Sequence, residues 1–144
     1  MIPYSKQFID DKDIKNVVKV LRSPLITQGS IVPKFENKVA SRCGSKYSFA
    51  VNSATSALHL ACLALDLKKG DTIWTVPNTF VASANCGLYC GAKVDFVDIN
   101  INTYNICVDS LSEKLKNAEK KNKLPKILIP VHFAGHPTKQ DEIW

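Results

Sequence analysis

The sequence has no apolar run near the roughly 20 residues that a membrane-spanning helix requires. Its first residues do not follow the basic and then apolar order of a secretion signal. Its five cysteines are an odd number at irregular spacings, which fits neither a disulfide framework nor a Cys-x-x-Cys metal site. These features predict a soluble cytoplasmic protein with reduced thiols and no membrane partner.

The sequence also lacks the pattern of a nucleic-acid-binding surface. The 19 basic and 13 acidic residues leave a net charge of +6, but the lysines are scattered, with a dense run only over residues 114–126. No aromatic residues alternate with basic ones as a base-stacking surface would require. Asp95 and Asp98 flank a predicted strand, but no histidine or third acid lies nearby. Neither a nucleic-acid partner nor a metal is therefore expected.

The chain alternates between helical and strand-like apolar patterns. Its 144 residues, 45% of them hydrophobic, suffice for one ordinary core. The spacings predict helices over about residues 10–21, 35–43, 54–65, 80–90 and 110–121, with another starting near residue 140. Ser110 and Glu113 form a candidate capping box. Strands are predicted over residues 47–52, 72–76, 93–98 and 126–132. This order predicts an α/β protein whose mostly parallel sheet has helices on both faces.

The helix over residues 54–65 is apolar almost all round, which predicts that several of its sides are covered. It follows directly on a predicted strand. Such a junction directs free backbone N–H groups at one point, where the helix dipole adds positive potential. Hydroxyls on Ser53, Thr55 and Ser56 add donors, so the segment fits either a phosphate cradle or an ordinary N-cap. The glycines of a GxGxxG fingerprint are missing, which disfavours a nicotinamide-dependent Rossmann enzyme.

Two further predicted strands end in residues that suit a ligand. Phe80, just after the strand over residues 72–76, is placed either to stack on a flat ring or to pack in the core. His132 ends the strand over residues 126–132 and fits either a catalytic or a structural histidine. Ligands of open α/β sheets bind beyond the carboxyl ends of the strands. The three segments together predict a site for a phosphorylated planar cofactor.

Several segments resemble, in order and spacing, the DegT/DnrJ/EryC1/StrS family of pyridoxal-phosphate (PLP)-dependent nucleotide-sugar aminotransferases. These segments are residues 3–4, 27–29, 35–36, 51–58, 70–71, 77–84, 91–98 and 129–135. The resemblance implies the N-terminal part of the type I, aspartate aminotransferase-like fold. It is strongest to the branch that makes pseudaminic acid.

The resemblance also implies roles for particular residues. Ala54, Thr55 and Ser56 would hold the PLP phosphate, and Phe80 would lie against the pyridine ring. The family usually has glycine where this chain has Ala54, and the extra methyl group limits close backbone approach. The residues that would face the UDP-sugar substrate are Tyr4, Pro24, Leu25, Ile26, Thr27 and Gln28.

By the same resemblance, residues 1–33 would form an N-terminal helix and substrate-loop segment, and residues 34–144 an incomplete PLP-binding large domain. The Schiff-base lysine and the C-terminal small domain would follow Trp144, so no catalytic residue is assigned and the chain alone is expected to be inactive. The parent enzyme would be a homodimer that converts the 4-keto group of a UDP-linked 6-deoxy sugar to an amine, with a donor such as glutamate. The alternatives are a sugar 3-dehydratase of the same family, in which histidine replaces the lysine, and a non-catalytic remnant.

Overall fold

The computed structural model describes residues 5–144, which divide into two compact units on either side of the bond between Ala50 and Val51. The first unit holds two helices, and the second holds a small sheet with its covering helices. No helix in the described range is long and apolar enough to cross a bilayer.

The first unit contains α1 (Asp11–Leu21) and α2 (Ile31–Cys43). A capping box starts α1: the Asp10 carboxylate accepts hydrogen bonds from the Lys12 and Asp13 N–H groups, and the Asp13 carboxylate accepts one from the Asp10 N–H. Gly44 ends α2 in the left-handed conformation, with φ 64°. Both helices confirm the sequence prediction, although α2 begins four residues before Phe35.

The predicted strand over residues 47–52 is wrong. This segment forms no ladder with any strand in the described range, and the Ala50 N–H instead donates a 2.8 Å hydrogen bond to a Glu36 carboxylate oxygen. Its β-branched and aromatic residues suit a strand, but a strand also needs a neighbour with which to exchange backbone hydrogen bonds. The local pattern cannot report that neighbour.

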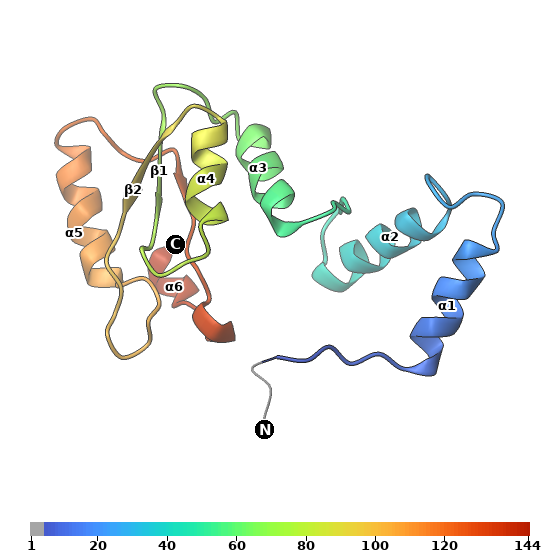
Figure 1. Cartoon of the computed structure of the whole chain (residues 1–144). Coiled ribbons are helices and arrows are strands. Elements are labelled where there is room, and N and C mark those ends of the chain that lie inside the picture. The colour runs from blue at the N-terminus through green and yellow to red at the C-terminus, as the bar shows by residue number, and fades with distance from the viewer. Residues whose placement is uncertain (1–4) are drawn as a thin grey trace. The chain divides into compact units, whose positions relative to one another are not determined.

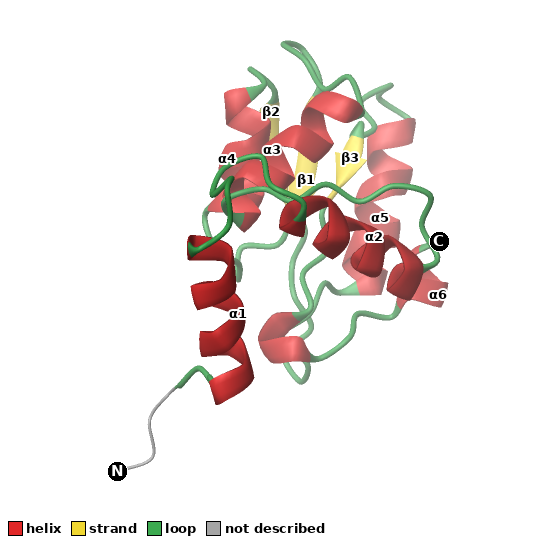
Figure 2. Ribbon diagram, turned by 90° about the vertical axis from the view of Figure 1, so that its right-hand side faces the viewer, coloured by secondary structure: helices red, strands yellow, loops and turns green. Residues whose placement is uncertain are grey.

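The second unit is built around a three-stranded parallel sheet of order β2-β1-β3 (Figures 1 and 2). The strands are β1 (Thr72–Thr75), β2 (Lys93–Phe96) and β3 (Ile127–Leu128). Helices α3 (Ala54–Ala64) and α4 (Ala82–Tyr89) lie on one side of the sheet, and α5 (Val108–Glu119) lies on the other. A 3-10 turn η1 (Phe133–Gly135) and a short helix α6 (Gln140–Ile143) follow β3. The predicted α/β class and the parallel sheet are confirmed.

The central strand β1 separates two apolar clusters. Ile73 packs with Cys62, Cys86 and other residues beneath α3 and α4, whereas its neighbour Trp74 packs with Leu111 and other residues on the α5 side. This alternation follows from the two-residue period of a strand. Both faces of β1 are therefore buried.

The expectation that α3 is covered on several sides is wrong for the part of the chain that the structure describes. Only Cys62 of α3 is buried, and Leu60 and Leu63 remain about half exposed. Helix α3 packs against α4, which covers one side of it.

The structure also corrects the starts of α4 and α5 and the length of β3. Helix α5 begins at Val108 with Cys107 as its N-cap, so Ser110 lies inside the first turn and the predicted capping box with Glu113 is not formed. Helix α4 begins at Ala82, two residues later than predicted. Strand β3 is only two residues long and ends before Pro130, which has no N–H to donate.

Candidate functional site

The N-terminus of α3 is a capped helix end that also has backbone donors without partners among the described residues. Ser53, in an extended conformation, is the N-cap, and its Oγ accepts a 3.2 Å hydrogen bond from the Ser56 N–H. Its carbonyl oxygen accepts the Ala57 N–H at 3.1 Å. Among the described residues, nothing accepts the N–H groups of Ala54 and Thr55. The N-cap therefore leaves two backbone donors for a ligand.

Some hydroxyls of this segment form hydrogen bonds within the fold, whereas one is available to a ligand. Ser56 Oγ donates a 2.7 Å hydrogen bond to the Asn52 side-chain oxygen and lies 3.1 Å from Ser53 Oγ. Ser56 therefore shapes the turn, while the Thr55 hydroxyl, like the Ala54 and Thr55 N–H groups, has no partner among the described residues. These groups suit a phosphate, because an 11-residue helix adds its dipole to donors that are already oriented.

Phe80 lies between the end of β1 and the start of α4, with 74% of its surface exposed. The alternative of a core phenylalanine is therefore wrong in this structure. Just beside it, the hydroxyls of Thr79 and Ser83 hydrogen bond to each other at 2.8 Å, which joins the turn to the first residues of α4. A fixed turn thus carries an exposed aromatic ring.

His132 lies just beyond β3 and is exposed. Its Nδ1 accepts a 3.0 Å hydrogen bond from the Thr138 N–H. The neutral ring must then carry its proton on Nε2, and that Nε2–H group has no acceptor among residues 5–144. His132 therefore has a structural contact through one nitrogen and a free donor on the other.

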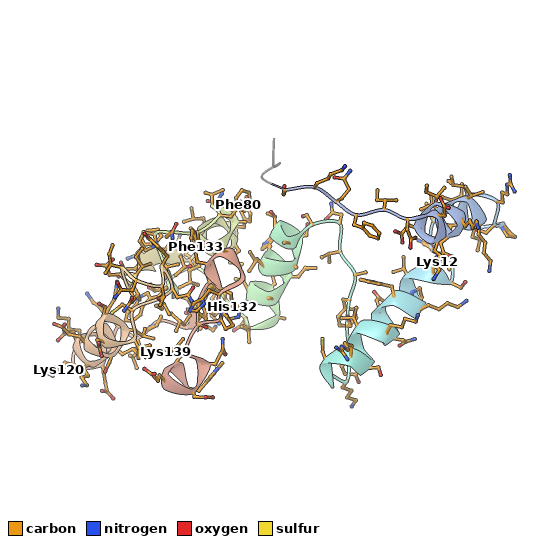
Figure 3. The ribbon with its side chains drawn as sticks, turned by 90° about the horizontal axis from the view of Figure 1, so that it is seen from below. Lys12, Phe80, Lys120, His132, Phe133 and Lys139 are labelled. Carbon is orange, nitrogen blue, oxygen red and sulfur yellow. The ribbon has the colours of Figure 1, made fainter. Side chains whose placement is uncertain are left out.

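These features lie at one edge of the sheet. Figure 1 shows that the N-terminal ends of α3 and α4 and the C-terminal ends of β1 and β3 lie together at the lower end of the second unit. Figure 3 views the molecule from that side and labels Phe80, His132 and Phe133 on it. A cleft of about 550 Å³ opens between the end of β1 and the segment after β3, lined by Pro77, Asn78, Ile99, Tyr104 and Phe133. This is the edge where open α/β sheets bind their ligands.

The residues predicted to face a sugar lie elsewhere in the chain. Residues 24–28 form the loop between α1 and α2 in the first unit, with Leu25 and Ile26 more than 60% exposed and Gln28 at φ 55°. The loop requires Gly29, because a Cβ there would lie 2.8 Å from the Leu25 carbonyl oxygen. Tyr4, the remaining predicted sugar contact, lies outside the described residues.

Asn105 is a polar residue at this edge that the sequence patterns did not indicate. It is 4% exposed, and its side chain hydrogen bonds to three backbone groups in residues 133–137. Its local signal is the asparagine-rich stretch over residues 100–105, which is typical of any turn.

The two aspartates considered as metal ligands have other partners. Asp95 forms a 2.7 Å ion pair with Lys114, and Asp98 accepts a hydrogen bond from the Ile99 N–H. Over residues 5–144, no three His, Cys, Asp or Glu side chains are grouped as metal ligands.

The site and fold together define an α/β protein whose α3 N-terminus presents backbone donors at the carboxyl edge of its sheet. The sequence model of the DegT/DnrJ/EryC1/StrS aminotransferase family matches residues 7–144. The chain belongs to this family.

Three relatives show how much of a family member this chain corresponds to. The chain is 40% identical over 143 residues to the UDP-4-amino-4,6-dideoxy-N-acetyl-beta-L-altrosamine transaminase of Campylobacter jejuni, covering 99% of the chain and 37% of the relative. It is similar to the structure of Helicobacter pylori PseC, an aminotransferase of pseudaminic acid biosynthesis, with 31% identity, a TM-score of 0.87, and coverage of 98% of the chain and 37% of that protein. A GDP-4-keto-6-deoxymannose-3-dehydratase structure with trapped PLP-glutamate gives 32% identity, a TM-score of 0.88, and coverage of 98% and 36%. The chain thus spans little more than a third of the length of each.

Proposed function

We propose that this chain supplies the cofactor-phosphate site and part of the sugar site of a PLP-dependent nucleotide-sugar aminotransferase. The observation that carries the proposal is the α3 N-terminus, whose free Ala54 and Thr55 N–H groups lie at the same edge as Phe80 and His132. The donors fit a phosphate group, and the exposed Phe80 ring fits a flat pyridine ring beside it.

In this proposal, the chain's own residues bind and orient the cofactor. The Ala54 and Thr55 N–H groups and the Thr55 hydroxyl would hold the phosphate, while Ser56 would keep the turn in shape through Asn52. Phe80 would cover one face of the ring and exclude water from it. The bound cofactor would supply the electron sink for amino-group transfer.

The proposed substrate is a UDP-linked 6-deoxy sugar whose 4-keto group becomes an amine, with an amino acid such as glutamate as donor. The Campylobacter and Helicobacter relatives support this choice, because the first is a transaminase of a UDP-linked amino sugar and the second an aminotransferase of pseudaminic acid biosynthesis. Pro24, Leu25, Ile26, Thr27 and Gln28 would face the nucleotide sugar, and Tyr4 is proposed with them. The proposed division remains residues 1–33 for that segment and 34–144 for the cofactor domain.

We also propose a cytoplasmic homodimer for the enzyme, with this chain alone inactive. The half-exposed apolar side chains of α1, which include Ile14, Val17 and Leu21, support a further packing partner for that helix. The second candidate function is a sugar 3-dehydratase, favoured by the likeness to the GDP-4-keto-6-deoxymannose-3-dehydratase. With the keto sugar and glutamate, the intact transaminase would release an amino sugar, whereas the dehydratase would release a keto sugar without its 3-hydroxyl group.

Pyridoxamine 5′-phosphate tests the phosphate site directly. Its amine does not react with the chain's lysines as the aldehyde of PLP would, so binding reports on the non-covalent site. We expect saturable quenching of its fluorescence by the chain, and weaker binding by roughly tenfold for Thr55→Val, which removes a hydrogen bond to a charged group.

Ser30→Ala is the matched control for this experiment. Ser30 is the N-cap of α2 but makes no side-chain capping hydrogen bond, so its loss should leave the affinity unchanged. Absence of saturable binding, or equal weakening by Thr55→Val and Ser30→Ala, would contradict the proposed function.

A further inference from the structure

The side chain of Asn105 holds the segment that follows β3. Its Nδ2 donates to the carbonyl oxygens of His136 and Pro137, each at 3.0 Å, and its Oδ1 accepts the Phe133 N–H at 2.9 Å. One buried amide thus satisfies three backbone groups that belong to no strand or α-helix. Asn105 is 4% exposed whereas residues 132–137 are exposed, so removing its amide would detach this exposed segment from its buried anchor.

The segment that Asn105 holds is closed around His132. The Thr138 N–H donates to His132 Nδ1 at 3.0 Å, and Thr138 itself is 5% exposed. Between them the chain passes through Ala134 at φ 50°, a conformation that a residue with a Cβ adopts at a cost. The turn therefore needs outside contacts to persist, and the three Asn105 hydrogen bonds provide them.

Asn105 is itself fixed to the core. Its carbonyl oxygen accepts the Asn100 N–H at 2.8 Å, and an antiparallel bridge pairs Ile99 with Ile106 on either side. Ile106 is 4% exposed and packs in the cluster around Trp74. The hairpin over residues 99–106 therefore connects the apolar core to the turn over residues 133–137.

The same hairpin shapes the cleft at the carboxyl edge. The Tyr104 ring lies 5.7 Å from the Phe133 ring, and both line the cleft with Pro77 and Asn78. Asn105 links these two residues. It directly follows Tyr104 in the sequence, and its Oδ1 accepts a hydrogen bond from the Phe133 N–H. Its hydrogen bonds thus set both the cleft wall and the histidine turn.

We propose that Asn105 is a positioning residue that fixes His132 in the tautomer with its proton on Nε2, and holds Phe133 against Tyr104 at the cofactor edge. The cofactor part of this role rests on the proposed function. The positioning part concerns the free chain and does not depend on any ligand.

The wild-type chain provides the first test. Imidazole ¹⁵N NMR at about pH 8.5, well above the ordinary histidine pKa of about 6.5, should show His132 with its proton on Nε2 and a coupling to the Thr138 amide. A proton on Nδ1 would overturn the proposal without any variant.

Substitutions then test the link to Asn105. Asn105→Asp keeps the size and the acceptor for Phe133, but presents a carboxylate oxygen to two carbonyl oxygens. Both Asn105→Asp and Asn105→Ala should therefore mix the His132 tautomers and speed hydrogen exchange of the Thr138 amide at least tenfold. Asn102→Asp, on the exposed part of the same hairpin, is the control and should change neither signal.

Pyridoxamine 5′-phosphate separates this inference from the proposed function. If the wild type binds it, the two Asn105 variants should bind at least tenfold more weakly than Asn102→Asp. Failure of the wild type to bind would contradict the proposed function, while the tautomer measurement would still decide the positioning role. A folded Asn105 variant with the wild-type tautomer and Thr138 exchange rate would overturn the inference.

Discussion

At the scale of single residues, hydrogen-bonding capacity decides what each group at the site can do. Ser53 and Ser56 use their hydroxyls within the turn, whereas the Ala54 and Thr55 N–H groups remain free. His132 uses Nδ1 and keeps Nε2. Residue types alone left both a structural and a functional interpretation open for Ser53 and His132, because the choice depends on which groups the folded backbone brings within hydrogen-bonding distance, such as the Thr138 N–H.

The cysteines give a prediction at this scale. The neighbouring Ser110 hydroxyl and N–H lower the pKa of the Cys107 thiol below its usual 9.0, whereas burial, with help from Cys86, raises the pKa of Cys62 to about 12. Near neutral pH, iodoacetamide should therefore alkylate Cys107 well before Cys62 in the folded chain.

Mass spectrometry of digested samples over a pH series would measure this order. Ser110→Ala should move the Cys107 alkylation profile to higher pH, and Ser112→Ala, in the same helix, is the control. An unchanged Cys107 profile in Ser110→Ala would show that the hydroxyl does not stabilise the thiolate.

At the scale of helices and strands, the hydrophobic period predicted most of the elements correctly but did not predict their exact boundaries. The patterns predicted α1, α3, β1 and β2 closely, because each follows from contacts within a few residues or from burial on both faces. The strand over residues 47–52 and the capping box at Ser110 were wrong for one reason. Each depends on a partner, a neighbouring strand or the true start of α5, that a local pattern does not contain.

The packing of α4 on β1 gives a prediction at the element scale. A Cβ on Gly87 would lie 2.5 Å from Ile73 Cδ1 and 2.8 Å from Ile73 Cγ1. An exposed Gly-to-Ala change in a helix usually stabilises by about 0.5–1 kcal/mol. Here we expect Gly87→Ala to lower the free energy of unfolding by about 1–3 kcal/mol, because this tight contact must open.

A double-mutant cycle with Ile73→Val tests whether the contact with Ile73 causes this loss of stability. Valine removes the Cδ1 atom that lies nearest, so Gly87→Ala should cost less in the Ile73→Val background, as urea melts would show. Equal costs in both backgrounds would mean that the contact between α4 and β1 is not the source.

At the scale of the whole molecule, ion pairs join segments that are far apart in the chain. Lys126, just before β3, lies 3.1 Å from an Asp71 carboxylate oxygen and 3.6 Å from one of Asp66. The Lys68 N–H and Lys126 lower the pKa of Asp71, and Lys68 followed by Lys126 lowers the pKa of Asp66, both from 3.8. These exposed contacts connect the start of β3 to the turn before β1.

The lowered pKa values predict an acid limit of stability. A carboxyl group whose pKa is lower folded than unfolded stabilises the fold above its unfolded value, and this contribution is lost as the pH falls through the folded value. The free energy of unfolding should therefore drop below about pH 4, since the unfolded value is 3.8. Urea melts followed by the fluorescence of Trp74, which is 3% exposed, would measure it.

Trp144→Phe removes the other, 96% exposed tryptophan from that signal. In the same background, Asp71→Asn should lessen the loss of stability between pH 4 and pH 3, because one titrating group is gone. If Asp71→Asn left the loss of stability in acid unchanged, other carboxylates would be its source.

The central claim is that the N-terminus of α3 binds the phosphate of the cofactor, and amide NMR with pyridoxamine 5′-phosphate tests it most directly. We expect the largest saturable ¹⁵N–¹H shifts at Ala54 and Thr55, with a second set at Phe80 that inorganic phosphate does not produce. Saturating shifts confined to other parts of the chain, or no shifts at all, would contradict the account.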